Sequence, residues 1–184
     1  MLLHQHLEKF AKSTPLQLFS EFSGKNLTYL DANKIANKLA RALLQEGLKK
    51  GDRFSFLAKN CDEMAIMYYA ASKAGIVPVP LNYRLADQEW QYIINDSQSK
   101  LIIVRSEEFV SRINSLKDKL DSVQKMIMLN SQEKYSDWNE FLKNAPEKII
   151  PRVKEEGPVD EWVHAIKNDT LPLSNFDYSA SLTE

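Results

Sequence analysis

Hydrophobic residues recur at two different spacings in the first part of the chain. Up to Pro15 the apolar side chains recur every three or four residues, which is the spacing of an amphipathic helix that the proline then ends. Residues 16–22 (LQLFSEF) alternate apolar and polar, as a half-buried strand does, and the following SGKN predicts a turn. The residues at 27–29 either begin a return strand or lead into the next helix.

Helices and strands then alternate over most of the chain. Helical spacing predicts helices at residues 29–46, 62–74, 86–96, 107–120 and 136–143. Short apolar runs predict strands at residues 53–58, 76–81, 101–106 and 125–129. The run 101–106 (LIIVRS) is typical of a strand buried on both faces, whereas Pro78 and Pro80 place the buried strand 76–81 at a sheet edge or end. The alternation predicts an α/β fold: a mainly parallel sheet, right-handed crossovers and helices on both faces.

Capping residues define where two of these helices begin and end. Thr28 followed by Asp31 is a capping-box-like start for the helix over 29–46. Asn60 with Glu63 repeats this signal before the helix over 62–74, which stops at a glycine. These signals place the start of both helices, and Gly75 places the end of the second.

The regular alternation ends near Ala145. The stretch PEKIIPRVKEEGP that follows is rich in proline and charge, which predicts a loop or linker, and residues 161–167 offer one or two helical turns. We therefore expect residues 1–145 to form the α/β unit and residues 146–184 to form a linker.

Composition narrows the class of protein. The 184 residues suit one compact domain or slightly more, with 43% hydrophobic and 27% charged residues, as in an average soluble protein. A net charge of −1 gives no field that would recruit nucleic acid or an anionic membrane, and no apolar run approaches the roughly 20 residues that span a bilayer. Cys61 is the only cysteine, so an intramolecular disulfide is excluded and a reducing, cytoplasmic location is expected.

Few residues suggest chemistry by themselves. His4 and His6 would point to different faces of a helix, and His164 is distant, so no metal site is expected. Cys61 lies at a predicted helix N-terminus, where the dipole favours a thiolate, but no His or Asn partner is near in sequence, which favours a small buried side chain. The lysines of the region 117–125 alternate with acids, which indicates a solvated face.

Three segments in a fixed order carry a family resemblance. They are LTY at 27–29, GLKKGDR at 47–53 and SKAGIVPVPLNYRL at 72–85. They resemble the N-terminal region of the adenylate-forming superfamily, the AMP-binding acyl-CoA synthetases and their relatives, which show L-T-Y, G-x-x-x-G-D-R and K-A-G-x-x-x-V-P-L. The passage DSQSKLIIVRS is also similar to the family's D-S-x-x-K/R-x-[IVL]. The likeness covers residues 5–130 and implies the fold of the family's N-terminal subdomain.

The polar corner that follows the third segment refines the resemblance. Asn82-Tyr83-Arg84-Leu85 is similar to the N-x-R-L of fatty and aromatic acid–CoA ligases, whereas peptide-synthetase domains usually read V-P-L-D-P here. Such ligases join a carboxylate to the α-phosphate of ATP and then pass the acyl group to a thiol, often that of CoA. The resemblance implies ATP, magnesium and CoA for the complete enzyme. Arg84 would be a candidate contact for a CoA phosphate, and the alternative is a surface or interdomain ion pair.

The family's phosphate loop, of the type T-S-G-T-T-G-x-P-K, has no counterpart in the sequence. After Gly75 the only glycine is Gly157, and the closing NFDYSASLTE resembles the strand that leads into that loop. We therefore expect the chain to be an N-terminal fragment of a ligase that contains no catalytic residue. Alone, this fragment is expected to bind no cofactor and to be inactive. Its partners would be the remainder of the ligase, in the same or a separate chain, and the carboxylic acid substrate. Residues 75–85 would shape one wall of the cleft.

A second hypothesis is a stand-alone binding or interaction module derived from the same fold, with no catalytic role. The surface left bare by the rest of the enzyme distinguishes the two, because a fragment should expose a large apolar patch and a free module should not.

Overall fold

The computed structural model describes residues 2–129 and 138–145. Contacts within the chain define two units, Met1–Ala145 and Pro146–Glu184, and every described residue belongs to the first. The predictions for residues 146–184, and for Ser136 as the start of the last helix, lie outside the described residues.

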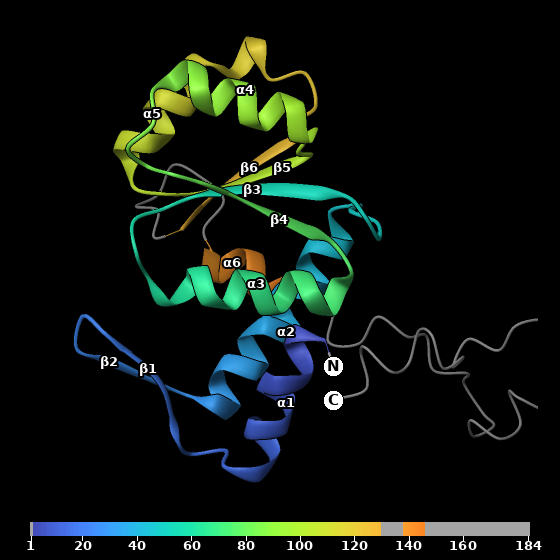
Figure 1. Cartoon of the computed structure of the whole chain (residues 1–184), viewed down its shortest axis with the longest axis vertical. Helices are drawn as coiled ribbons and strands as arrows, with labels where there is room; N and C mark the ends of the chain where they lie inside the picture. The colour runs from blue at the N-terminus through green and yellow to red at the C-terminus, as the bar shows by residue number, and fades with distance from the viewer. Residues whose placement is uncertain (1, 130–137, 146–184) are drawn as a thin grey trace, which may run out of the picture. The chain divides into compact units, whose positions relative to one another are not determined.

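Four short strands form a parallel sheet in the order β4-β3-β5-β6 (Figure 1). The strands are β3 (Arg53–Leu57), β4 (Val77–Leu81), β5 (Leu101–Arg105) and β6 (Lys125–Leu129). All three pairings are parallel, which confirms the predicted sheet. Within the described residues β4 pairs only with β3, so the two prolines of β4 do lie in an edge strand.

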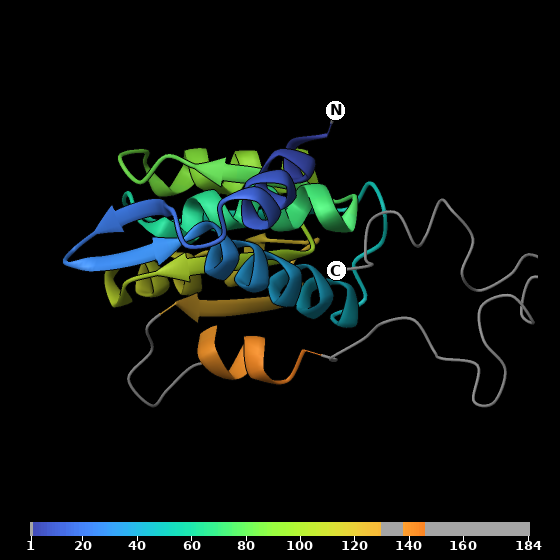
Figure 2. The ribbon, with the colours of Figure 1, turned by 90° about the horizontal axis from the view of Figure 1, so that it is seen from below.

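Helices cover both faces of this sheet, as predicted. The face formed by Phe54, Phe56 and Ile103 packs against α2 (Tyr29–Gln45), α3 (Asp62–Ala74) and α6 (Trp138–Lys143) (Figures 1 and 2). The opposite face packs against α4 (Asp87–Ser97) and α5 (Glu107–Ser115). Successive side chains of a strand point to opposite faces, so the apolar run of β5 is buried on both sides.

An N-terminal helix and a hairpin complete the unit. Helix α1 (Leu3–Ser13) packs against α2 and α3, and β1 (Leu18–Phe22) pairs antiparallel with β2 (Lys25–Thr28). The two turn residues Ser23 and Gly24 both have positive φ, as a two-residue hairpin with right-handed strand twist favours. None of the helices in the described ranges is long and apolar enough to cross a membrane.

Three local predictions needed correction. The residue before α3 is Cys61 and not Asn60, since Cys61 has the extended backbone and its carbonyl accepts from the Met64 N–H. Helix α5 ends at Ser115, and a 3₁₀ turn, η1 (Lys117–Lys119), follows it because the chain tightens into i→i+3 hydrogen bonds before turning toward β6. Strand β4 is partly exposed, not buried, because it is an edge strand.

A polar cluster joins α1 to α3 inside this mostly apolar unit. The ammonium group of Lys73, whose side chain is 2% exposed, is paired with the carboxylate of Glu8. In the same interface between α1 and α3, Nδ1 of His4 lies 2.9 Å from the hydroxyl oxygen of Ser72. Burial lowers the pKa of His4, which therefore packs as a neutral ring at neutral pH.

Candidate functional site

The carboxyl ends of the parallel strands form the candidate site. The chain passes outward from β3 to β4 and then returns to β5 and β6 on the other side of β3, so the strand order reverses between β3 and β5. In open α/β sheets, ligands bind beyond the strand ends at such a reversal. The loop after β3 leads to α3 on one face, and the end of β5 leads to α5 on the other.

The polar corner Asn82–Leu85 follows β4 at this edge. The side-chain oxygen of Asn82 accepts a hydrogen bond from the backbone N–H of Arg84 at 3.0 Å, and its backbone oxygen accepts from the N–H of Leu85 at 3.1 Å. The corner is therefore a closed turn held by its first residue, as expected for an asparagine at a turn.

Two side chains from the helices above the sheet support this corner. Trp90 of α4 is fully buried, and its indole N–H donates to the backbone oxygen of Asn82 at 2.8 Å. Arg112 of α5 donates to the backbone oxygen of Leu85 at 3.0 Å and to the carboxylate of Asp87 at 2.6 Å. Its guanidinium carbon lies 3.8 Å from the centre of the Trp90 ring, close enough for a cation–π contact.

Arg84, the one binding residue proposed from sequence, is exposed on this corner. Its Nε donates to the hydroxyl of Tyr83 at 3.2 Å, and its guanidinium carbon lies 5.5 Å from the centre of that ring. The ammonium of Lys59, from the loop after β3, lies 5.9 Å from the same ring centre. Within the described residues neither cation is paired with a carboxylate, so both can meet an anion.

The helix N-termini at this edge are already occupied by acidic side chains. The first turn of α3 carries Asp62 and Glu63, and that of α5 carries Glu107 and Glu108. These carboxylates stabilise the positive ends of the helix dipoles and would repel a second anion. An anion at this edge would therefore be attracted by Lys59 and Arg84 and not by a helix end.

Cys61 shows no sign of a reactive thiol. Burial raises its pKa, and the hydrogen bond from Arg105, which favours the thiolate, does not outweigh that effect. The guanidinium of Arg105 also forms an ion pair with the carboxylate of Glu63 at 3.2 Å, so its positive charge is not available to Cys61 alone. Cys61 is half-buried, in keeping with the small packing role expected from sequence.

Metal-binding groups do not gather in the part of the chain that the structure describes. No three His, Cys, Asp or Glu side chains lie close enough there to hold a metal ion. His4 is buried and His6 is exposed, so they do point to different sides of α1, and His164 lies outside the described residues.

Lys59, Trp90 and Arg112 are the site residues that sequence reasoning missed. The position of Lys59 directly after a predicted strand was a usable signal, because strand ends of a parallel sheet share one edge. No local sequence signal pointed to Arg112, because its hydrogen-bond partner Leu85 lies 27 positions away in the chain.

Comparison with known proteins gives the family. The model of the family described as AMP-binding enzyme matches residues 7–167, which is most of the chain. The long-chain-fatty-acid–CoA ligase FadD13 of Mycobacterium tuberculosis is 43% identical over 77 residues, covering 42% of this chain and 15% of the relative. The acyl-CoA ligase sidI of Beauveria bassiana is 29% identical over 155 residues, covering 81% of this chain and 27% of the relative. The chain thus spans less than a third of either relative.

A solved structure agrees with these sequence matches. The N-terminal domain of FACL13 from Mycobacterium tuberculosis superposes with a TM-score of 0.71 at 29% identity, covering 85% of this chain and 39% of the other. The matched region is the N-terminal one, as the order of the sequence motifs predicted. The chain belongs to the AMP-binding enzyme family and corresponds to the N-terminal region of the adenylate-forming superfamily.

Proposed function

We propose that this chain forms the N-terminal part of an acid–CoA ligase and that its corner Asn82–Leu85 lines one wall of the active-site cleft. The observation that carries the proposal is the corner itself. It has the N-x-R-L form of acid–CoA ligases, lies at the carboxyl edge of the sheet beside the strand reversal, and is held by Trp90 and Arg112. The names of the relatives, fatty-acid–CoA and acyl-CoA ligases, support this reading.

The exposed apolar residues are consistent with a part that packs against more protein. Five of the eight large hydrophobic side chains exposed in the described ranges lie between residues 2 and 18, namely Leu2, Leu3, Phe10, Leu16 and Leu18. Where such side chains form one contiguous patch, the patch marks a surface that another segment covers. We propose that the covering segment is the remainder of the ligase, in the same or a separate chain.

The site supplies cations for a phosphate group, but neither a phosphate loop nor magnesium ligands accompany them in the described residues. Lys59 and Arg84 are exposed cations at one edge and suit a phosphate of CoA. In contrast, no glycine-rich loop lies after Gly75 in the sequence and no acidic metal cluster lies among the described residues. We propose that adenylation, and the binding of ATP and magnesium, use residues that this chain does not supply.

The adenylation proposal is tested by pyrophosphate exchange. The purified 184-residue chain should show no acid-dependent exchange of labelled pyrophosphate into ATP when it is offered acetate, hexanoate or benzoate. A complete fatty-acid–CoA ligase assayed in parallel provides the positive control. Exchange above the no-acid background would overturn the proposal, because it would require a phosphate site within this chain.

The CoA proposal is tested on the same chain with Arg84→Ala. CoA titrated into the chain should perturb the backbone amide signals of residues 82–85, and the variant should weaken that binding about tenfold, as the loss of one charge-assisted hydrogen bond predicts. Lys38→Ala, an exposed lysine of α2, is the matched control and should leave the affinity unchanged. Equal affinity for the Arg84→Ala and unmodified chains would assign Arg84 to the surface.

A further inference from the structure

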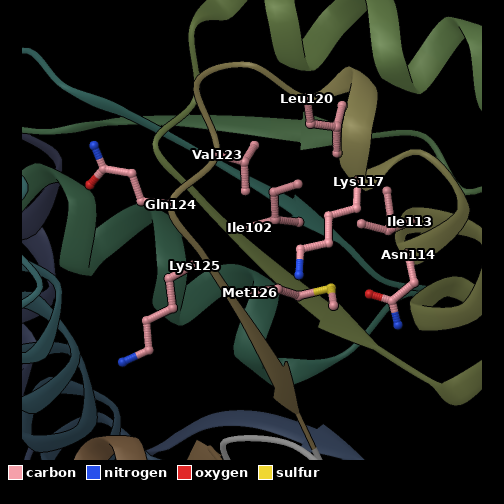
Figure 3. A pocket seen from close by; sticks show the side chains of 9 residues that line it. All are labelled: Ile102, Ile113, Asn114, Lys117, Leu120, Val123, Gln124, Lys125 and Met126. Carbon is pink, nitrogen blue, oxygen red and sulfur yellow. The ribbon is translucent and has the colours of Figure 1, made fainter.

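A second concave site lies at the other edge of the sheet, at the amino ends of β5 and β6. A pocket of about 290 Å³ opens between α5, η1 and the start of β6 (Figure 3). The corner Asn82–Leu85 follows the carboxyl end of β4, so this pocket is separate from the candidate site. Its volume is just below the range that is usual for small-molecule sites, about 300–1,000 Å³, and suits only a small ligand.

The floor of the pocket is apolar. Ile102 of β5 and Ile113 of α5 are buried beneath it, and Met126 of β6 is half-buried at its side. Leu120 and Val123, from the connection between η1 and β6, complete the apolar lining. The early end of α5 accounts for the hollow, because α5 stops at Ser115 and the short 3₁₀ turn η1 follows it, so within the described residues α5 does not extend over the amino end of β6 on this face.

One cation reaches over this apolar floor. In the view of Figure 3 the side chain of Lys117 extends from η1 across the pocket, toward Ile102 and Met126. Within the described residues the side chain of Lys117 has no ion pair and no hydrogen-bond partner. Lys125, the other lysine of the lining, points away and is bound to the carboxylate of Glu46 at 2.5 Å. Among the described residues that line the pocket none is acidic.

We propose that this pocket binds a small apolar carboxylate, with the hydrocarbon part on Ile102, Ile113 and Met126 and the carboxylate on the Lys117 ammonium. An aliphatic tail replaces water over the apolar floor, and the unpaired cation gives a carboxylate an advantage over a neutral ligand of the same shape. Asn114 also lines the pocket and appears near Met126 in Figure 3. Its side-chain amide offers one donor group and one acceptor to a ligand. The proposal does not depend on the ligase activity.

The sequence predicts a solvated face for this region, in which lysines alternate with acids. Lys117, Asp118 and Lys119 are all exposed, as that prediction requires, but of the three only Lys117 lines the pocket. It is the turn from α5 into η1 that directs Lys117 alone across the apolar surface.

The test uses the whole chain with hexanoate as ligand and hexanamide as its neutral match. Hexanoate should shift the methyl signals of Ile102, Ile113 and Met126 in a saturable way, and hexanamide should bind about tenfold more weakly, as expected for one lost charge-assisted hydrogen bond. Lys117→Ala should weaken hexanoate by the same factor and remove the preference over hexanamide, whereas Lys117→Arg should retain it. The exposed Lys119→Ala is the matched control and should change nothing.

A second variant tests whether the methyl signals shift because hexanoate binds in this pocket or because it binds at another place on the chain. Met126→Trp fills the pocket and should abolish the hexanoate shifts at Ile102 and Ile113 while the far-UV circular dichroism spectrum is retained. Equal binding of hexanoate and hexanamide, shifts that survive Met126→Trp, or an effect of Lys119→Ala as large as that of Lys117→Ala would each overturn the proposal. So would pocket signals that move on dilution without ligand, because a second copy of the chain would then be the occupant.

Discussion

Replacing Glu8 with alanine is expected to lower the free energy of unfolding by about 3 kcal/mol, the lower end of the cost of breaking a buried ion pair from one side. The substitution leaves the ammonium of Lys73 in a site where its side chain is only 2% exposed, without the carboxylate that now compensates its burial. Urea unfolding followed by circular dichroism at 222 nm measures the change. The lower end applies because the Glu8 side chain is itself 23% exposed.

Replacing the lysine of this ion pair should change the free energy of unfolding much less than replacing the glutamate. Lys73→Met keeps an apolar stem of similar length on α3 and removes the buried charge, while the partly exposed Glu8 can turn to water. We expect this variant to cost less than about 1 kcal/mol, and the double variant Glu8→Ala/Lys73→Met to recover most of the loss seen with Glu8→Ala alone. Equal losses for the two single variants would contradict this account, since they would show that the contact and not the buried charge matters.

Lys73 also shows what a motif conveys and what it omits. In the sequence, Lys73-Ala74-Gly75 served only to identify the family and the end of a helix. In the structure, Gly75 ends α3 in the left-handed conformation, as the glycine predicts, whereas Lys73 fastens α3 to α1. The glycine's role depends on its own backbone and can be predicted locally. The role of the lysine depends on Glu8, 65 positions away, and cannot.

The elements themselves were predictable because their signals are local. The helix over 62–74 was placed with the bounds that the structure gives, and the strand pattern identified β5 and β6. The errors arose where tertiary contacts decide, as at the early end of α5. The pairing of β3 with both β4 and β5 was not predicted, and it is this strand order that locates the carboxyl-edge site.

The candidate site was predicted only in part, for the same reason. Arg84 and the corner Asn82–Leu85 were recognised from a contiguous motif. Lys59 approaches Tyr83 from the loop after β3. Arg112 bonds Leu85 from α5, a helix that follows β5 in the sequence. A sequence pattern that is read along the chain does not bring these residues together, because their proximity follows from the crossovers of the sheet.

Truncating Trp90 to alanine is expected to destabilise the protein by about 3–5 kcal/mol and to loosen the corner that we assign to the cleft wall. Trp90 is fully buried, lies 5.9 Å from the Phe109 ring in an edge-on arrangement, and contacts the Arg112 guanidinium. Its removal leaves a cavity between α4 and α5, and the surrounding side chains can fill it only in part. Tyr92→Ala, at an exposed position of the same helix, should cost less than about 0.5 kcal/mol and serves as control.

Trp90→Phe separates the packing role from the hydrogen bond. Phenylalanine keeps an aromatic ring in the core but cannot donate to the backbone oxygen of Asn82, which would retain only the N–H of Leu85. We expect a loss of about 1–2 kcal/mol, together with shifted amide signals at residues 82–85. Unchanged amide signals in Trp90→Phe would show that the indole N–H does not position the corner. In that case Arg112, which bonds both the Leu85 oxygen and the carboxylate of Asp87, would be the residue that holds the corner in place, and Trp90 would support the corner by packing alone.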